Sequence, residues 1–304
     1  MTTKEIFVKT MKFTWLKLAL GGITIVAMAI LVAIFLGIGS LLGEAGFAVG
    51  LVLSVISIGV ARMLILIYFG YLIKAGHIAI IMQASTTGHI PENQFEVAKQ
   101  MVTERFATST IYFGIDRLIS GTVKQLQGIV SKVGDLLGKV IPGMDFITAI
   151  LNAFINISLG YIDECCLAYT FYQREQNAFK SAADGVVIYY QNWKVLLKNA
   201  AMTALMVVGF TLFFTIVMFL LLAGIFKLFD GSLFIAFIIA FVIALALKNA
   251  FLDSFILIRT MVAYMQVAPT TVITHDLYGK LCGISSKFKS LFNKSTETQQ
   301  AQTY

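Results

Sequence analysis

Residues 18–42 read LALGGITIVAMAILVAIFLGIGSLL, an apolar run without a single charged side chain. About 20 apolar residues in an α-helix suffice to cross the hydrocarbon core of a bilayer. The run follows four lysines, Lys4, Lys9, Lys12 and Lys17, and is too long for the core of a signal peptide. It therefore predicts a retained membrane helix near the N-terminus.

Comparable apolar runs recur along the chain, at residues 50–73, 146–171, 201–226 and 232–259. The composition agrees, because 58% of the residues are hydrophobic and 13% are charged, against about 45–50% and about 25% in soluble domains. These values exclude a soluble globular enzyme, a disordered chain and a disulfide-rich secreted module. The predicted fold class is all-α, a polytopic bundle of membrane helices.

Residues 108–140 form a helical segment of mixed character. Apolar side chains recur on one face, while Gly114, Gly121 and Gly128 alternate with Arg117 and Lys124 on the other. Small residues at this spacing let membrane helices approach closely. The segment is either a further span that packs through its glycine face or an amphipathic helix on the membrane surface.

The distribution of basic residues favours six spans with both termini in the cytoplasm. In that arrangement only Lys132, Lys139 and Lys227, out of 23 basic residues, lie on the outer side. Lysine and arginine are enriched on the cytoplasmic side of membrane proteins. Five spans would place the loop 173–200 and the basic C-terminal tail on opposite sides. The net charge of +7 is thus explained by topology, and no nucleic-acid partner is expected.

The predicted organisation has three parts. Residues 1–17 form a basic cytoplasmic N-terminus, and residues 18–267 form the membrane bundle, with interfacial segments at 85–107 and 173–200. Residues 268–304 form a basic to polar cytoplasmic tail, which we expect to be disordered from Ser295 onward because it is polar and lacks periodicity. The expected location is a membrane, crossed several times.

Sequence motifs for catalysis or cofactor binding are absent. The chain has no zinc-protease, nucleophile-elbow, P-loop or dinucleotide-binding pattern. His77, His89 and His275 lack metal-ligand spacing and are expected to be solvated loop residues. We therefore expect no enzymatic activity, no metal and no cofactor.

Ionisable residues inside the predicted spans are the most informative ones. A charge at the centre of a bilayer costs about 2.5–3.5 kcal/mol on insertion scales, so it requires a partner or water. We expect these groups to pair across helices, Arg62 with Asp163 or Glu164, and Lys248 with another carboxylate. These groups either form structural ion pairs or lie on the path of a solute.

Two tyrosines flank the acidic pair. Tyr161 lies one turn before Glu164, and Tyr169 lies just over one turn beyond it. Carboxylates beside aromatic rings suit an organic cation, because ring faces attract cations. The candidate solute site is therefore Asp163, Glu164, Tyr161 and Tyr169, with Arg62, Lys248 and Asp253 balancing charge.

Residues 110–265 resemble the C-terminal part of the choline transporter-like family. The family's cytoplasmic S-A-K-D-A-F pattern corresponds to SAADGVVIYYQN, with matches at Ser181, Ala182, Asp184 and Asn192. Its V-D-T in the last span corresponds to LDSFILI, with Asp253 and Ser254 in register, whereas the family's lysine is replaced by Ala183. The resemblance implies transport of choline or related ethanolamine-type solutes by a reduced relative.

The sequence thus predicts a transporter-like membrane protein that moves a small organic solute, with a choline-like cation as the candidate. The alternative is a membrane scaffold or assembly factor that packs against partner helices through Gly114, Gly121 and Gly128. A channel subunit is the third reading. Expected partners are membrane lipid, a small solute, and a second copy or another membrane protein.

Overall fold

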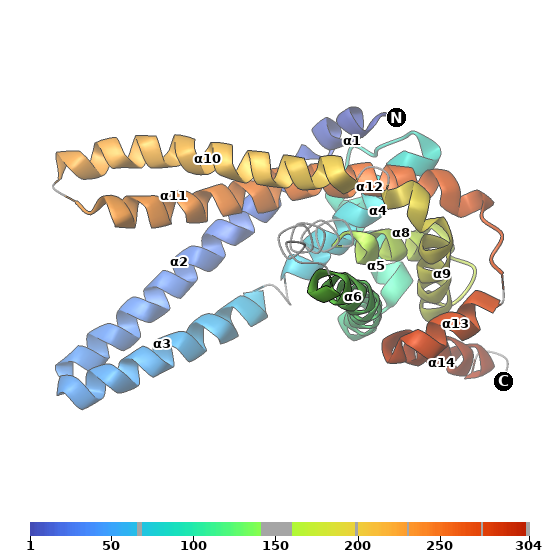
Figure 1. The fold of residues 1–304 in the computed structure, drawn as a ribbon, viewed down its shortest axis with the longest axis horizontal. Coiled ribbons are helices and arrows are strands. Elements are labelled where there is room, and N and C mark those ends of the chain that lie inside the picture. The colour runs from blue at the N-terminus through green and yellow to red at the C-terminus, as the bar shows by residue number, and fades with distance from the viewer. Residues whose placement is uncertain (66–68, 141–159, 198–199, 230, 275, 302–304) are drawn as a thin grey trace.

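Two long helical hairpins project from a helical body in the computed structural model of the chain (Figure 1). The structure describes residues 1–65, 69–140, 160–197, 200–229, 231–274 and 276–301. Within these ranges every regular element is a helix.

The first hairpin pairs α2 (Met11–Leu41) with α3 (Gly43–Ile65). Gly43 joins them with φ +77°, a left-handed conformation that glycine adopts without strain. The helices then cross in close contact, because a Cβ added at Gly50 would lie 2.5 Å from the Phe35 carbonyl oxygen. Such a crossing is possible only where both helices lack side chains at the point of contact.

The second hairpin pairs α10 (Ala200–Leu228) with α11 (Leu233–Leu247). The chain then continues through a π-helical turn, η2 (Lys248–Leu252), into α12 (Asp253–Val267). The apolar part of this continuous helix lies in the hairpin, while α12 enters the body. Lys248 and Asp253 therefore lie at the junction of hairpin and body.

Both hairpins expose their apolar side chains. In the most apolar windows of α2 and α10 only 6% of the residues are buried inside the protein. Among the described residues, four helices are long and apolar enough to cross a membrane, at Met11–Leu41, Gly43–Ile65, Leu205–Leu228 and Leu233–Thr270. Exposed apolar surface of this extent belongs in lipid, so the chain is an all-helical membrane protein.

The body has a hydrophobic core of its own. It is built from α1 (Thr3–Lys9), α4 (Tyr71–Thr87), α5 (Gln94–Phe106), α6 (Ser109–Val140), α8 (Ile162–Tyr172), α9 (Ala178–Leu197), α12, α13 (Asp276–Ile284) and α14 (Ser286–Ala301). A short 3₁₀ turn, η3 (Ala268–Thr270), follows α12. Fully buried side chains in the core include Ile78, Ile115 and Val187.

The four candidate membrane helices overlap the predicted spans at 18–42, 50–73, 201–226 and 232–259. The second helix is Gly43–Ile65, and residues 71–73 of that predicted span belong to α4 of the body. The segment 108–140 is α6, whose buried Tyr112, Ile115 and Ile119 form a helical stripe against the body. The predicted span 146–171 lies largely outside the described residues. Its described end is α8, a helix of 11 residues buried in the body.

The predicted interfacial segments and the tail also belong to the body. Residues 85–107 contain α5, and residues 173–200 contain α9, which packs on α8 and α14. The prediction of disorder from Ser295 onward was wrong, because α14 continues to Ala301 and Asn177 donates a hydrogen bond to the Ser295 carbonyl. Tertiary contacts stabilise a helix that the local sequence did not indicate.

Candidate functional site: a charged chamber at the base of the hairpins

A cavity of about 540 Å³ lies where both hairpins meet the body. Its walls come from α2, α4, α8, α10 and the continuous helix α11–η2–α12. The polar side chains of the wall are Lys17, Lys74, Tyr161, Glu164, Lys248, Asn249 and Asp253. We call this cavity the chamber.

The first group of charges centres on Lys74, at the start of α4. Its ammonium lies 3.2 Å from Asp116, 3.7 Å from Asp163 and 3.4 Å from Glu164, measured to the nearest carboxylate oxygen. We call these four residues the negative cluster, because one ammonium faces three carboxylates. The second oxygen of Glu164, Oε2, is buried and has no hydrogen-bond partner among the described residues.

Protonation of the negative cluster follows from its geometry. Burial opposes the charge of Lys74, but the Glu164 and Asp163 carboxylates outweigh that effect and raise the pKa of Lys74 well above its usual range. Burial, together with the adjacent Asp163 carboxylate, raises the pKa of Glu164 well above its usual value. Glu164 is thus the carboxyl group that takes up a proton most readily in this cluster.

The second group of charges lies at the junction helix. Lys248 Nζ is 3.0 Å from Asp253 Oδ2, and the Tyr161 hydroxyl donates to Asp253 Oδ1 at 2.8 Å. Lys17 donates to Ser254 Oγ at 3.1 Å. We call Lys17, Lys248 and Asp253 the positive cluster, because it holds two ammonium groups and one carboxylate, with which only Lys248 pairs.

Lys17 also begins a chain of hydrogen bonds into the body. Its ammonium lies 2.9 Å from His77 Nδ1, and His77 Nε2 lies 3.2 Å from Thr10 Oγ1. An ammonium can only donate, so His77 Nδ1 accepts and Nε2–H donates to Thr10. Burial and the Lys17 charge both lower the pKa of His77 well below its usual value, so the ring is neutral.

The structure brings only part of the sequence-predicted site together. Four predicted residues line the chamber, namely Tyr161, Glu164, Lys248 and Asp253, and Asp163 contacts the lining residue Lys74. Tyr169 is buried elsewhere, against α9 at Gly185, where burial raises its pKa to about 12. Arg62 is exposed near the end of α3, and the predicted pairing of Arg62 with the acidic residues was wrong, because Lys74 occupies that position.

The predicted glycine face of residues 108–140 packs at one position. A Cβ at Gly121 would lie 2.9 Å from the Lys287 side chain of α14, but Cβ atoms at Gly114 and Gly128 would meet nothing within 4 Å. The close glycine-mediated helix contact is instead in the first hairpin, at Gly39, Gly46 and Gly50. Among the described residues no helix therefore packs closely at Gly114 or Gly128, and their packing against helices of a partner stays a prediction.

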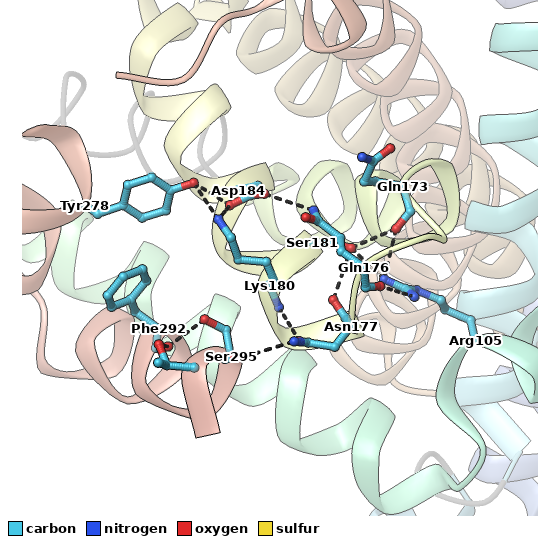
Figure 2. Close-up of polar contacts among 11 residues, drawn as sticks. Arg105, Gln173, Gln176, Asn177, Lys180, Ser181, Asp184, Tyr278, Phe292 and Ser295 are labelled. Carbon is cyan, nitrogen blue, oxygen red and sulfur yellow. Dashed lines mark hydrogen bonds and ion pairs between the residues drawn. The ribbon is translucent and has the colours of Figure 1, made fainter. Parts of the chain in front are cut away.

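The family-matched positions Ser181, Ala182, Asp184 and Asn192 all lie on α9, away from the chamber. Asp184 accepts hydrogen bonds from Tyr278 and Gln176 and pairs with Lys180 (Figure 2). Burial and the hydrogen bond to Asp184 raise the pKa of Tyr278. These contacts attach α13 to α9.

Neighbouring contacts hold α9 against α8. Ser181 accepts from Arg105 at 2.6 Å and donates to the Gln173 carbonyl at 2.8 Å (Figure 2). Ala182 is fully buried in the core, and Asn192 donates to Thr271 at 3.0 Å. These four α9 residues stabilise the body and do not line the chamber, whereas Asp253, which also matches the family, does.

Sequence reasoning missed Lys74, Lys17, Asp116 and His77 as members of the site. His77 was expected in a solvated loop, but it is fully buried on α4 and stacks on Phe13 at 5.0 Å. His89 is exposed as expected, and His275 lies outside the described residues. A signal was present for Lys74 and His77, because they share one face of α4 at i,i+3 spacing amid apolar residues.

Comparison of the chain with protein-family models, with curated proteins and with solved structures finds no match. The resemblance to choline transporter-like proteins therefore stays a prediction, and the candidate site rests on geometry and charge.

Proposed function

We propose that the protein is a multi-pass membrane protein that binds a small organic solute in the chamber and moves it across the membrane. The observation that carries this proposal is the chamber itself, a cavity of about 540 Å³ with charges of both signs at the base of the membrane helices. Buried ionisable groups near membrane helices are expensive, and in membrane proteins they mark solute or ion paths. The unpartnered Oε2 atom of Glu164 adds an acceptor without a donor.

The proposed topology has each hairpin crossing the bilayer twice, with the body in the cytoplasm. The 23 residues of α3 give a helix of about 34 Å, enough for a hydrocarbon core of about 30 Å. Residues 18–61 and 201–247 together contain one basic residue, Lys227, out of 23 in the chain. Most of the other basic residues among those that the structure describes belong to the body or to helix ends beside it, the side that the positive-inside rule assigns to the cytoplasm.

In the proposed mechanism a solute enters the chamber from the body side and displaces one contact of the negative cluster. Glu164 and Asp163 attract the cationic part of the solute, and Tyr161 supplies an aromatic wall. Lys74 balances the carboxylate charges when no solute is bound, the role that the sequence suggested for Arg62. The two hairpins diverge from the body (Figure 1), so transport requires them to approach each other or to meet the hairpins of a second copy.

Uptake into proteoliposomes tests this function with Glu164→Gln and Asp163→Asn. The panel contains radiolabelled choline, ethanolamine, betaines and amino acids. The matched control is Glu104→Gln, an exposed carboxylate of α5 that pairs with Arg174 at 3.9 Å on the surface. We expect uptake of one solute class to fall at least about tenfold in the chamber variants, equivalent to about 1.4 kcal/mol, and to be unchanged in the control. Equal uptake by all variants would contradict the assignment of the chamber.

A non-transporting scaffold is the second candidate function. The observation in its favour is the divergence of the hairpins, whose exposed apolar faces a partner's helices can cover. The scaffold function predicts that the folded wild-type protein takes up no solute. It also predicts that crosslinking in native membranes recovers a stable complex.

A further inference from the structure

The charges around the chamber are separated by sign. In the negative cluster one ammonium faces three carboxylates, for a formal net charge of −2, or −1 when Glu164 is protonated. The positive cluster holds two ammonium groups and one carboxylate, for a formal net charge of +1. Lys74 of α4 and Glu164 of α8 line the chamber for the first cluster, and Asp116 and Asp163 contact Lys74 without lining it. The second cluster lines the chamber from α2 and the junction helix.

Lys17 is the cation of the positive cluster that lacks a counter-ion. Its ammonium is hydrogen-bonded to His77 and Ser254, both neutral, and no carboxylate of the described residues lies within 4 Å of it. A partly buried cation of this kind is stabilised by an anion that enters the chamber. Lys248, in contrast, has Asp253 at 3.0 Å.

Glu164, in the negative cluster, supplies the complementary observation. Its Oε1 atom lies 3.4 Å from Lys74, but its Oε2 atom is buried without a hydrogen-bond partner among the described residues. Unsatisfied buried acceptors are rare in folded proteins because they cost about 1–3 kcal/mol. When Glu164 is ionised, a donor supplied by a bound molecule satisfies this oxygen.

We propose that the solute is a zwitterion whose cationic group lies against the negative cluster and whose anionic group lies against Lys17. This inference rests on the proposed function and names its substrate class. A bare cation leaves Lys17 without an anion and is repelled by two ammonium groups. A bare anion meets an excess of carboxylates at Glu164. A zwitterion matches both clusters, and it enters the chamber without changing its net charge.

Thermal unfolding in lipid nanodiscs tests the inference with two sets of matched probes. The first set is glycine betaine, choline and 3,3-dimethylbutyrate, which share a branched head and differ in charge. The second set is 4-aminobutyrate, butylamine and butyrate. We expect the zwitterion of one set to raise Tm at concentrations at least about tenfold lower than its cationic and anionic counterparts.

The variants Lys17→Gln and Lys17→Arg separate charge from hydrogen bonding, and Lys12→Gln is the exposed control on the same helix. Lys17→Gln is expected to remove the preference for the zwitterion over the matched cation, and Lys17→Arg and Lys12→Gln to keep it. If Lys17→Gln does not fold, the comparison of the zwitterion with its matched cation and anion on the wild-type protein still tests the inference.

The outcomes distinguish the inference from the function on which it rests. A cation or anion that binds as tightly as its matched zwitterion overturns the inference and leaves the proposed function intact, as does a zwitterion preference that survives in folded Lys17→Gln. A protein that none of the six probes stabilises contradicts both.

Discussion

At the scale of single residues, His77 is the group whose protonation state the structure fixes most clearly. It is fully buried on α4, stacked on Phe13, and its Nδ1 atom accepts from the Lys17 ammonium. A second proton on the ring would place two cations in contact within a dry environment. Burial and Lys17 therefore lower the pKa of His77 well below its usual value.

His77 makes the protein less stable in acid. In the unfolded chain the pKa of His77 returns to about 6.5, so below that pH the unfolded state binds a proton that the folded state excludes. The free energy of unfolding then falls as the pH decreases from about 7 toward 5, with a slope of up to about 1.4 kcal/mol per pH unit. We expect denaturant unfolding in detergent to show this slope in the wild type and to lose it in His77→Gln.

The exposed His89 provides the control, because His89→Gln leaves the slope unchanged. Glu164, whose pKa is raised, contributes with the opposite sign, but it does so equally in all three proteins. An identical pH dependence in wild type and His77→Gln would show that His77 is accessible to protons in the folded state.

Individual site residues were predictable from sequence only where a charge interrupts an apolar run. Asp163, Glu164, Lys248 and Asp253 were found this way, since a charge among apolar residues requires a partner. Lys74 and Lys17 were read as ordinary cytoplasmic lysines, because their partners come from α8 and α12, which are distant in sequence. Which cation meets which anion depends on tertiary packing.

At the scale of elements, the contact between α2 and α3 rests on glycine. Cβ atoms at Gly39 and Gly46 would each lie 2.7 Å from a backbone oxygen of the facing helix, and one at Gly50 would lie 2.5 Å from the Phe35 oxygen. Backbone atoms cannot rotate away as a side chain can. The first hairpin therefore tolerates no side chain at its crossing.

Gly50→Ala is expected to destabilise the hairpin by about 1–3 kcal/mol, the usual cost of overpacking. The matched control is Gly59→Ala on the same helix, where an added Cβ meets nothing within 4 Å. There the helix propensity of alanine makes the change neutral or slightly stabilising. Unfolding in denaturing detergent measures both variants, and equal stabilities would contradict the close crossing.

The sequence predicted which segments are helices, but it did not predict whether a helix lies in the membrane or packs in the body. The apolar runs and the helical period of residues 108–140 indicated helices, as observed. The sequence did not reveal that α6 and α8 pack in a body, since an amphipathic stripe fits a protein core as well as a neighbouring membrane helix. Gly46 and Gly50 lie one turn apart on α3, and Gly114, Gly121 and Gly128 lie two turns apart on α6. Both spacings place glycines on one helix face, and only the partner helix distinguishes them.

At the scale of the whole molecule, the hairpins and the body differ in surface and charge. The hairpins expose apolar surface and carry almost no charge, while the body carries most of the charge and a packed core. The chamber lies at their junction, where the wide η2 turn places Lys248 and Asp253 on one wall. This arrangement puts the charged residues at the level of a membrane interface.

Cysteine accessibility tests that arrangement. Cys165 and Cys166 are buried, so a variant in which Cys282 is replaced has no accessible native cysteine among the described residues. New cysteines at Glu44 and Ser232 mark the hairpin tips, and one at Lys99 marks the body. A membrane-impermeant maleimide is expected to label the tips but not the body in intact cells, and all three after lysis. Tips and body labelled from the same side would indicate hairpins that do not cross.

The most direct test of solute binding in the chamber is protection of a cysteine placed in its wall. Asn249 is exposed and lines the chamber, so Asn249→Cys in the Cys282→Ser background is expected to react with a small thiol reagent. At about ten times the dissociation constant of the stabilising solute, about nine-tenths of the sites are filled and the reaction slows about tenfold. A cysteine at Lys99 is expected to react at an unchanged rate. Equal rates at position 249 with and without a solute that stabilises the protein would place its binding site elsewhere.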